Sequence, residues 1–424
     1  MALQKRPLAS DPPFQSSQGR IRVEEGVRPA GINPTIDEGL EPVGSPSRVV
    51  TALAPARRNR AIHGCRIVSI MRWIVGVVLL LAAVFFVGQR SEFVQDRLID
   101  KAVGTQLTNR GHELLEEDAL RALLCGTSSP LPHPTRAKAC VAIYAGGKFW
   151  IVDTGPGSWN RLALTGIDPA RIGGIFFTHF HSDHIGDLGQ FNMQTWAGGR
   201  PEPLRVFGPA GVDRVVRGFE EAYALDRGYR VAHHGAEFMP PEIAKMLPNV
   251  IPDMKDGERT LVLEEDGLRV LAFNVDHTPV KPAVGYRFES LGRSVVVSGD
   301  TVKSSSLITA AKGADVLIHE AQANHIVSRI EKAAAATDRP RVSRIMKDII
   351  SYHTSPVQAA ESANEAGVQL LVMYHLVPPP PVRLMETIFT RGVNEVRDGG
   401  WMLGNDGLLV TLPADSDAIE ISSR

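Results

Sequence analysis

The sequence predicts an α/β (α+β) domain preceded by one N-terminal transmembrane helix. From about Gly104 onward, short runs rich in β-branched residues alternate with amphipathic stretches and Gly/Pro turns. A single long apolar run without charge interrupts the otherwise polar N-terminal part. The 424 residues, 43% hydrophobic and 22% charged, are enough to bury a large core. We therefore expect a globular domain to follow the apolar run.

Residues 1–66 are expected to form a disordered basic tail. Pro, Ser, Gly and Arg dominate this part and no apolar periodicity is sustained, so it cannot bury enough surface to offset its ordering entropy. We divide the rest, in order, into a transmembrane signal-anchor, a linker, a folded domain and a C-terminal tail, at residues 67–90, 91–115, 116–415 and 416–424. Met71 precedes the apolar run as a secretory start would, so translation from Met71 instead of Met1 is a second hypothesis.

The apolar run from Trp73 to Gly88 contains 16 residues without a charge. At about 1.5 Å per residue it falls slightly short of a hydrocarbon layer of about 30 Å, but the preceding IVSIM segment extends it. Through Arg72, eleven Lys and Arg stand against six Asp and Glu. This excess predicts a cytoplasmic N-terminus and an extracytoplasmic, periplasmic domain. A cleaved signal peptide is the alternative, although no clear AxA site follows; a buried core helix is the other.

Overall charge and cysteine content exclude some classes of protein. The formal net charge is −1, which disfavours a nucleic-acid partner, although an average does not exclude a basic patch. Three cysteines without CxxC spacing predict neither a disulfide framework nor a thiolate metal site. We therefore interpret Cys65, Cys125 and Cys140 as buried or incidental thiols.

The strongest chemical signal is the segment FFTHFHSDHIGD, residues 176–187. An apolar strand is followed by three histidines and an aspartate within six positions, namely His179, His181, Asp183 and His184. Imidazoles two residues apart at a strand end can hold one cation, and a carboxylate with a third imidazole can reach a second. A lone histidine would be interpreted as a core residue, but this cluster predicts a metal site.

These residues resemble the HxHxDH signature of the metallo-β-lactamase superfamily, and further apolar runs supply candidates for its later positions. They are His277 in NVDHTP, Asp300 in VVVSGDT and His375 in LLVMYHL. The resemblance implies a four-layer αββα sandwich and two Zn²⁺ ions, with Mn²⁺ or Fe as alternatives. It implies that His179, His181 and His277 bind the first ion, Asp183, His184 and His375 the second, and Asp300 both. Asp183 would also be catalytic, accepting a proton from a bridging water.

Two further segments are similar to the ribonuclease Z and arylsulfatase-like branch of this superfamily. LIHEAQ at 317–322 resembles its HEAT motif, and YHTSPVQ resembles its HST segment. The resemblance implies that Glu320 and His353 form a catalytic proton-donating pair. A neighbour of a helix cap is the alternative for His353, and the role of His319 stays open. Asp153 in VDTG is expected either to orient a ligand histidine or to serve a structural turn.

The sequence departs from ribonuclease Z in two places. No room exists for its tRNA-binding arm between His277 and Asp300, and PTRAK at 134–138 differs from the PxKxxT-type loop. We therefore expect a membrane-anchored dinuclear zinc hydrolase of the exported arylsulfatase type, which cleaves phosphate or sulfate esters through a metal-activated hydroxide. The expected partners are a small-molecule ester and the membrane, through the N-terminal helix. A homodimer is also considered, and nucleic acid is disfavoured.

Two other functions stay open. One is a ribonuclease Z-type 3′ tRNA-processing endonuclease, and the other is a non-catalytic or redox metal module. Residues 209–260 are expected to form an insertion or connector near the site. Phe219, Tyr223 and Phe238 within it would serve either a lid over the metals or ordinary packing.

Overall fold

The computed structural model describes residues 21–23, 61–108 and 111–424, so most of the predicted N-terminal tail lies outside the described residues. These residues fall into two compact units. The smaller contains residues 61–108, and the larger contains residues 21–23 together with 111–424.

The smaller unit consists of helices α1 (Ala61–Arg90) and α2 (Glu92–Thr108). Among the described residues, α1 contains the one segment long and apolar enough to cross a membrane, Met71–Arg90. A signal sequence would have the same length and composition, so the anchor stays a prediction. Helix α2 occupies most of the segment that the sequence suggested as a linker.

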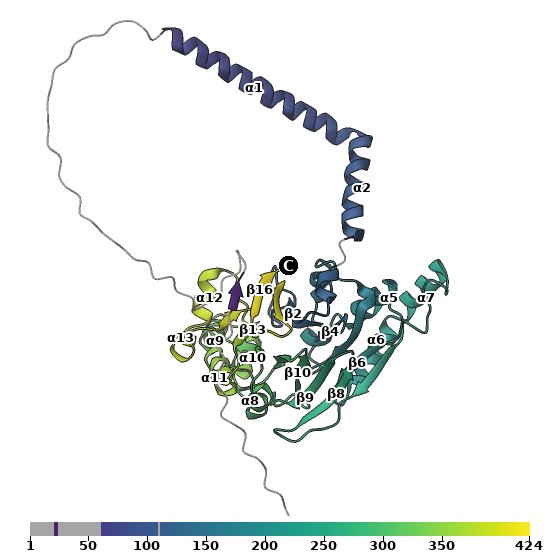
Figure 1. The fold of residues 1–424 in the computed structure, drawn as a ribbon. Coiled ribbons are helices and arrows are strands. Elements are labelled where there is room, and N and C mark those ends of the chain that lie inside the picture. The colour runs from purple at the N-terminus through teal and green to yellow at the C-terminus, as the bar shows by residue number, and fades with distance from the viewer. Residues whose placement is uncertain (1–20, 24–60, 109–110) are drawn as a thin grey trace, which may run out of the picture. The chain divides into compact units, whose positions relative to one another are not determined.

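The larger unit is built on two sheets, shown in Figure 1. Among the described residues, the first runs in the order β1 (Ile21–Val23), β16 (Ile419–Ser423), β15 (Leu408–Pro413), β2 (Ala119–Gly126), β3 (Cys140–Ala145), β4 (Lys148–Val152), β5 (Ile172–Phe176), β6 (Leu204–Gly208) and β7 (Met246–Val250). The second runs in the order β14 (Trp401–Leu403), β13 (Leu370–Val377), β12 (Val316–Gln322), β11 (Arg293–Val297), β10 (Val284–Ser290), β9 (Leu268–Asn274) and β8 (Arg259–Glu265).

The main core lies between the two sheets. Phe176 in β5 stacks on Phe207 in β6, with ring centroids 4.7 Å apart, and also contacts Tyr286 and Phe288 in β10 of the other sheet. All four rings are buried. Strands β5 and β6 of one sheet and β10 of the other turn these rings toward each other. Burial of the aromatic rings therefore stabilises the packing of the two sheets.

Helices cover the outer faces and complete the αββα sandwich that the sequence predicts. One group follows the first sheet's strands: η1 (His112–Leu115), α3 (Ser158–Ala163), η2 (Pro169–Arg171), α4 (Ser182–Ile185), α5 (Leu188–Ala197), α6 (Val212–Ala222) and α7 (Ala224–His234). The other comprises α8 (Ser305–Ala311), α9 (Asn324–Ala336), α10 (Pro340–Ile349), α11 (Pro356–Ala366), α12 (Arg383–Phe389) and α13 (Val393–Val396). Separate apolar clusters join α3, α5 and α6 to the first sheet and α8, α11 and α12 to the second.

Two segments differ from the sequence interpretation. Residues 416–424, expected to be a tail, contain β16, which pairs with β15 and buries Ile419 and Ile421. Residues 209–260, expected to be helical and loop-like, also contain β7, which pairs with β6 at the sheet edge. Each strand has only five residues, so its alternation of apolar and polar side chains is too brief to predict a strand from the sequence.

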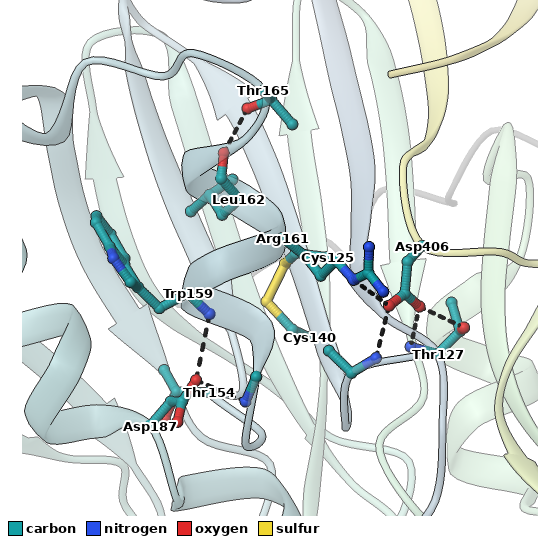
Figure 2. Close-up of a disulfide and its surroundings, with 12 residues drawn as sticks. Cys125, Thr127, Cys140, Thr154, Trp159, Arg161, Leu162, Thr165, Asp187 and Asp406 are labelled. Atoms are coloured by element: carbon teal, nitrogen blue, oxygen red, sulfur yellow. Dashed lines mark hydrogen bonds and ion pairs between the residues drawn. A yellow bond between two sulfur atoms is a disulfide. The ribbon is translucent and has the colours of Figure 1, made fainter. Parts of the chain in front are cut away.

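A disulfide joins Cys125 to Cys140, so the interpretation of these two residues as thiols was wrong (Figure 2). They are 15 positions apart in the sequence, but β2 and β3 are antiparallel neighbours and bring their Cα atoms to 5.0 Å. Closing a loop of this length stabilises a fold by about 3 kcal/mol in the chain-entropy model. The bond also holds the end of β2, where the carbonyl of Thr127 accepts a hydrogen bond from Leu376 N, beside His375.

Glu265 in β8 ties the two sheets together at one end. It accepts hydrogen bonds from Arg205 Nη1 and Nη2 in β6 (2.6 and 2.8 Å) and from Lys148 Nζ in β4 (3.1 Å). The hydrogen bonds of Arg205, and secondarily those of Lys148, lower the pKa of Glu265 to about 2. A carboxyl whose pKa is lowered on folding adds stability above its unfolded pKa, and that stability is lost as the pH falls toward the folded value.

We therefore expect Glu265→Gln to lower the free energy of unfolding by about 1 kcal/mol at pH 7, as for a partly exposed ion-pair network. The difference from wild type should shrink between about pH 4.5 and pH 2, because wild-type Glu265 then loses its charge. Urea unfolding across this pH range measures it. Glu237→Gln, which changes an exposed glutamate, is the control. A difference that stays constant with pH would contradict this role.

Candidate metal centre

Loops at the ends of the strands bring the predicted site residues together. His179 and His181 follow β5, and His181 is the N-cap of α4, which carries Asp183 and His184. The remaining residues come from the second sheet: His277 follows β9, Asp300 follows β11, Glu320 lies in β12 and His375 lies in β13. Strands β11, β12 and β13 are parallel, so their carboxyl ends meet at one edge.

The side chains form two groups that could each hold a metal ion. One contains His179, His181, His277 and Asp300, and the other contains Asp183, His184 and His375; within each, the ligand atoms lie within 4.8 Å of one another. Asp300 also reaches the second group, because its Oδ2 lies 3.4 Å from His184 Nε2 and its Oδ1 lies 3.4 Å from His375 Nδ1. A third grouping combines Asp300, His353 and His375.

Several buried nitrogen and oxygen atoms of these residues have no hydrogen-bond partner in the described ranges, as is expected of atoms that bind a cation. His184 Nε2, His277 Nε2, His375 Nδ1 and Asp300 Oδ1 are buried and have no hydrogen-bond partner among the described residues. Buried polar atoms without a partner are costly, and native proteins rarely leave several in one place. Because all four atoms belong to the two groups above, a bound cation is the partner that would satisfy them together.

Electrostatics at the site indicate the same need for positive charge. Burial alone would lower the pKa of His184, but the charges of Asp300, Asp153 and Asp183 outweigh it and hold that pKa well above the usual value. Burial and the nearby charge of His184 hold the pKa of His179 well below its usual value. Burial would raise the pKa of Asp300, but His375 and His184 hold it well below the usual range. The carboxylates thus stay ionised and attract cations.

Asp153 orients one of these histidines. It adopts a left-handed conformation with φ 59°, and its Oδ2 accepts hydrogen bonds from His184 Nδ1 and Thr178 Oγ1, both at 2.8 Å. Its Oδ1 accepts from Thr178 N at 2.9 Å. Of the two expectations for this residue, the hydrogen bond to a ligand histidine is the one seen. It leaves His184 Nε2 facing the carboxylates.

Glu320 and His353 form a buried pair beside the two groups. His353 Nδ1 lies 2.9 Å from Glu320 Oε1, which also accepts hydrogen bonds from Thr354 N and Thr301 N at 3.1 and 3.2 Å. Burial alone would lower the pKa of His353, but the charge and hydrogen bond of Glu320 raise it above the usual value. The imidazole is therefore held near Asp300 with a proton available around neutral pH.

Sequence reasoning missed three contributors to this site. The carbonyl of Tyr352 accepts a hydrogen bond from His277 Nδ1 at 2.9 Å, which leaves His277 Nε2 to face Asp300. Thr301 and Thr354 donate their backbone N–H groups to Glu320. Each of the three is adjacent to a motif residue, but backbone contacts carry no residue-type signal, so only the fold reveals them.

The other candidates lie outside the two groups. His319 is buried and its Nδ1 lies 2.7 Å from the carbonyl of Glu320. Phe219 and Tyr223 are half-buried and pack in the apolar clusters around α5 and α6, whereas Phe238 is 77% exposed. Packing is therefore the observed role of the first two aromatic residues of the expected lid.

We expect Asp153→Ala to weaken metal binding by about 10- to 100-fold, as measured for other residues that support a metal ligand. The reason is that His184 loses the hydrogen bond that fixes its ring. Competition with a chromophoric chelator measures the affinity. Asp187→Asn is the control, because Asp187 lies in the same motif as His184 but binds the N–H groups of Gly157 and Trp159 instead of a ligand histidine. Figure 2 shows its contact with Trp159. Equal loss in both variants would contradict the assignment.

Comparison with known proteins agrees with this geometry. Residues 150–376 match the family described as the Beta-lactamase superfamily domain. The chain is 37% identical to the ribonuclease Z of Mycobacterium bovis over 262 residues, 61% of this chain and 86% of that protein. It is 37% identical to the ribonuclease Z of Mycobacterium marinum over 258 residues, 60% of this chain and 85% of that protein.

A solved structure shows the same fold. The metallo-beta-lactamase fold protein YhfI of Bacillus subtilis has a TM-score of 0.50 and 18% identity, over 69% of this chain and 100% of that one. At this identity the likeness concerns the fold alone.

These relatives correct two expectations. The arylsulfatase-type function, with a small-molecule ester as partner and nucleic acid disfavoured, was wrong, because the matched proteins are ribonucleases at 37% identity. The missing arm and the neutral net charge misled that interpretation, since neither observation concerns the site itself. The chain therefore belongs to the metallo-β-lactamase superfamily and, within it, is a metal-dependent hydrolase of the ribonuclease Z branch.

Proposed function

We propose that this protein is a ribonuclease Z-type endonuclease that cleaves precursor tRNA near its 3′ end with two Zn²⁺ ions. The observation that carries the choice of substrate is the 37% identity to the ribonuclease Z of Mycobacterium bovis over 86% of that protein. The geometry that supports the chemistry is the pair of buried ligand groups joined by Asp300, with a protonatable histidine beside them.

The ligands would divide between the two ions as the groups do. His179, His181 and His277 would hold the first ion, and Asp183, His184 and His375 would hold the second. Asp300 lies between the groups, 3.4 Å from both His184 Nε2 and His375 Nδ1, and would serve both ions. Two bound zinc ions supply an activated water and offset the negative charge of the attacked phosphate.

Asp183 would accept a hydrogen bond from the attacking water in this proposal. Burial would raise its pKa, but the charge of His184 and the hydrogen bond and charge of His375 lower it to about 2. Its carboxylate is therefore ionised at neutral pH, as a ligand and a hydrogen-bond acceptor of water must be. His375 Nε2 lies 3.1 Å from Asp183 Oδ2, which fixes the carboxylate in place.

Glu320 and His353 protonate the leaving group. Because His353 Nδ1 is bound to Glu320, its Nε2 is the atom that donates a proton to the departing oxygen. Glu320 is buried and stabilises the positive imidazolium before transfer. The pair thus keeps an acid next to the metal groups at a pH where a free histidine would be largely neutral.

Cleavage of precursor tRNA by the full chain loaded with zinc tests this proposal. We expect the precursor to be cut once near the 3′ end of the tRNA, and sequencing of the products identifies the position of the cut. His181→Ala should lose metal and activity together, because it removes a ligand. His353→Ala should keep its metal and lose activity by about 10²-fold or more, as for a general acid.

The exposed His233 on α7 provides a control, since His233→Ala should change neither metal content nor cleavage. Equal metal loss in His181→Ala and His353→Ala would contradict the assigned roles. No cleavage of any precursor tRNA by the metal-loaded wild type would refute the function.

We also propose that Met71–Arg90 anchors the protein with its N-terminus in the cytoplasm and the hydrolase domain outside. The excess of basic residues before the helix supports this orientation, and so does the Cys125–Cys140 disulfide, since disulfides persist mainly in oxidising compartments. Precursor tRNA is made in the cytoplasm, so this orientation and processing of precursor tRNA in the cell exclude each other, and the reporter fusion below decides between them.

A reporter fused to the C-terminus of the full chain tests the orientation. Alkaline phosphatase should be active and green fluorescent protein dark when fused there. The reverse pattern would place the domain in the cytoplasm and contradict the orientation. The cleavage assay uses purified protein and does not depend on this outcome.

A further inference from the structure

Helices α9 and α10 form a hairpin inserted between the two members of the proton-donating pair. The chain leaves β12 just after Glu320, passes through α9 and α10, and returns at His353. Gln322 joins both ends of the hairpin: its N–H donates to the carbonyl of Thr354 at 2.7 Å and its Nε2 to that of Ile349 at 3.0 Å. The hairpin is thus anchored at the site at both ends.

The inner side of this hairpin is fixed by packing. Val327 of α9 and Met346 of α10 are buried against Val377, which lies in β13 two residues after His375, and Ile330 and Ile349 pack around them. Because these residues recur at helical spacing, the opposite side of each helix must face solvent. The outward side chains therefore have a defined position relative to the site.

Exposed cations line this outward side. The hairpin from Asn324 to Ile349 contains six Lys or Arg against three Asp or Glu, a net charge of +3 in a chain of net charge −1. The six are Arg329, Lys332, Arg339, Arg341, Arg344 and Lys347, all exposed. The hairpin is therefore a local basic surface that the overall charge conceals.

Most of these cations lack an anionic partner. Arg344 pairs with Asp348 at 2.8 Å, and Glu331 accepts a hydrogen bond from Ser343 instead of a cation. Within the part of the chain that the structure describes, the other five form no ion pair. On the hairpin of α6 and α7, by contrast, Arg217 and Arg230 each bind an aspartate four residues earlier. Unpaired cations remain free for an external anion.

The spacing of the cations on α10 suits a phosphate backbone. Arg341, Arg344 and Lys347 recur every three residues, so the row spans about 9 Å along the helix axis at 1.5 Å per residue. Each strand of a double helix carries one phosphate per nucleotide, about every 3.4 Å of axis in B-form DNA and somewhat closer in A-form RNA, so two or three phosphates fall within reach of this row. Arg329 and Lys332 extend the surface on α9.

We propose that this basic surface, Arg329, Lys332, Arg339, Arg341, Arg344 and Lys347, binds the sugar-phosphate backbone of the RNA stem next to the cleavage point. The inference rests on the proposed function and assigns the surface that holds its substrate. The β10–β11 hairpin, between His277 and Asp300, has its two arginines, Arg287 and Arg293, paired with carboxylates. By contrast, most cations of the basic surface on α9 and α10 have no anionic partner among the residues that the structure describes, and this surface continues directly into His353.

The test uses the triple variant Arg341→Gln, Arg344→Gln, Lys347→Gln of the full chain. Glutamine keeps helix propensity and removes three charges. Fluorescence anisotropy with labelled mature tRNA, which cannot be cleaved further, measures binding against salt concentration. We expect the dissociation constant to rise on the order of tenfold or more, and the slope of log affinity against log salt to fall by about two to three.

Kinetics provide a second readout. With precursor tRNA, KM should rise while kcat and zinc content stay near wild type, because the surface binds substrate without touching the reacting atoms. A short oligonucleotide that cannot reach the hairpin should be cleaved equally by both proteins. The control triple variant Arg214→Gln, Arg217→Gln, Arg230→Gln removes the same charge from α6 and α7 and should bind tRNA like wild type.

The outcomes separate the two proposals. Equal weakening by both triple variants, or no weakening by either, overturns the RNA surface while leaving cleavage activity in place. Binding of mature tRNA that depends on the hairpin, without cleavage of any precursor, refutes the nuclease function but retains the surface. Vesicles of phosphatidylglycerol that bind wild type and not the hairpin variant, with tRNA binding unchanged, would assign the surface to a membrane and overturn the RNA proposal.

Discussion

The buried carboxylate of Asp300 is the constraint on which the rest of the site depends. It lies between two groups of histidines and is only 2% exposed, and one of its oxygens has no hydrogen-bond partner among the described residues. Ionised groups are costly to bury unless opposite charge surrounds them. The neighbouring imidazoles offset part of this negative charge, and bound cations would offset the rest. The chemistry of the site follows from this need for positive charge.

The two-sheet architecture is what allows such a cluster to exist. Each sheet contributes ligands from its strand ends and the segments that follow them, and the aromatic core around Phe176 packs the two sheets against each other. Hydrogen bonds from Asp153 and from the carbonyl of Tyr352 fix the rings of His184 and His277. Ligand positions therefore depend on the packed scaffold, and we expect them to change little when a cation binds or leaves.

The sequence can point to the candidate metal groups because metal ligands are particular residue types, four of them here at short spacing. His179, His181, Asp183 and His184 come from one motif, and His277, Asp300 and His375 follow apolar runs in the family's order; the structure brings all seven together. The αββα sandwich is likewise predicted, since it follows from the same resemblance. The metal groups and the sandwich can both be inferred from local sequence patterns, without knowledge of long-range contacts.

What the sequence does not reveal depends on contacts between distant residues. The Cys125–Cys140 disulfide needs the pairing of β2 with β3, and β16 needs β15 as its neighbour. The substrate was inferred wrongly because a neutral net charge averages the basic α9–α10 hairpin with acidic residues elsewhere. Charge location, not total charge, decides whether a phosphate backbone can bind.

The central claim is that two cations share Asp300 in the buried cluster. The most direct measurement is a crystal structure of the zinc-loaded protein with anomalous data collected at the zinc edge. We expect two zinc peaks, one among His179, His181 and His277 and one among Asp183, His184 and His375, with Asp300 bound to both. A single peak, or two peaks with Asp300 bound to neither, would contradict it.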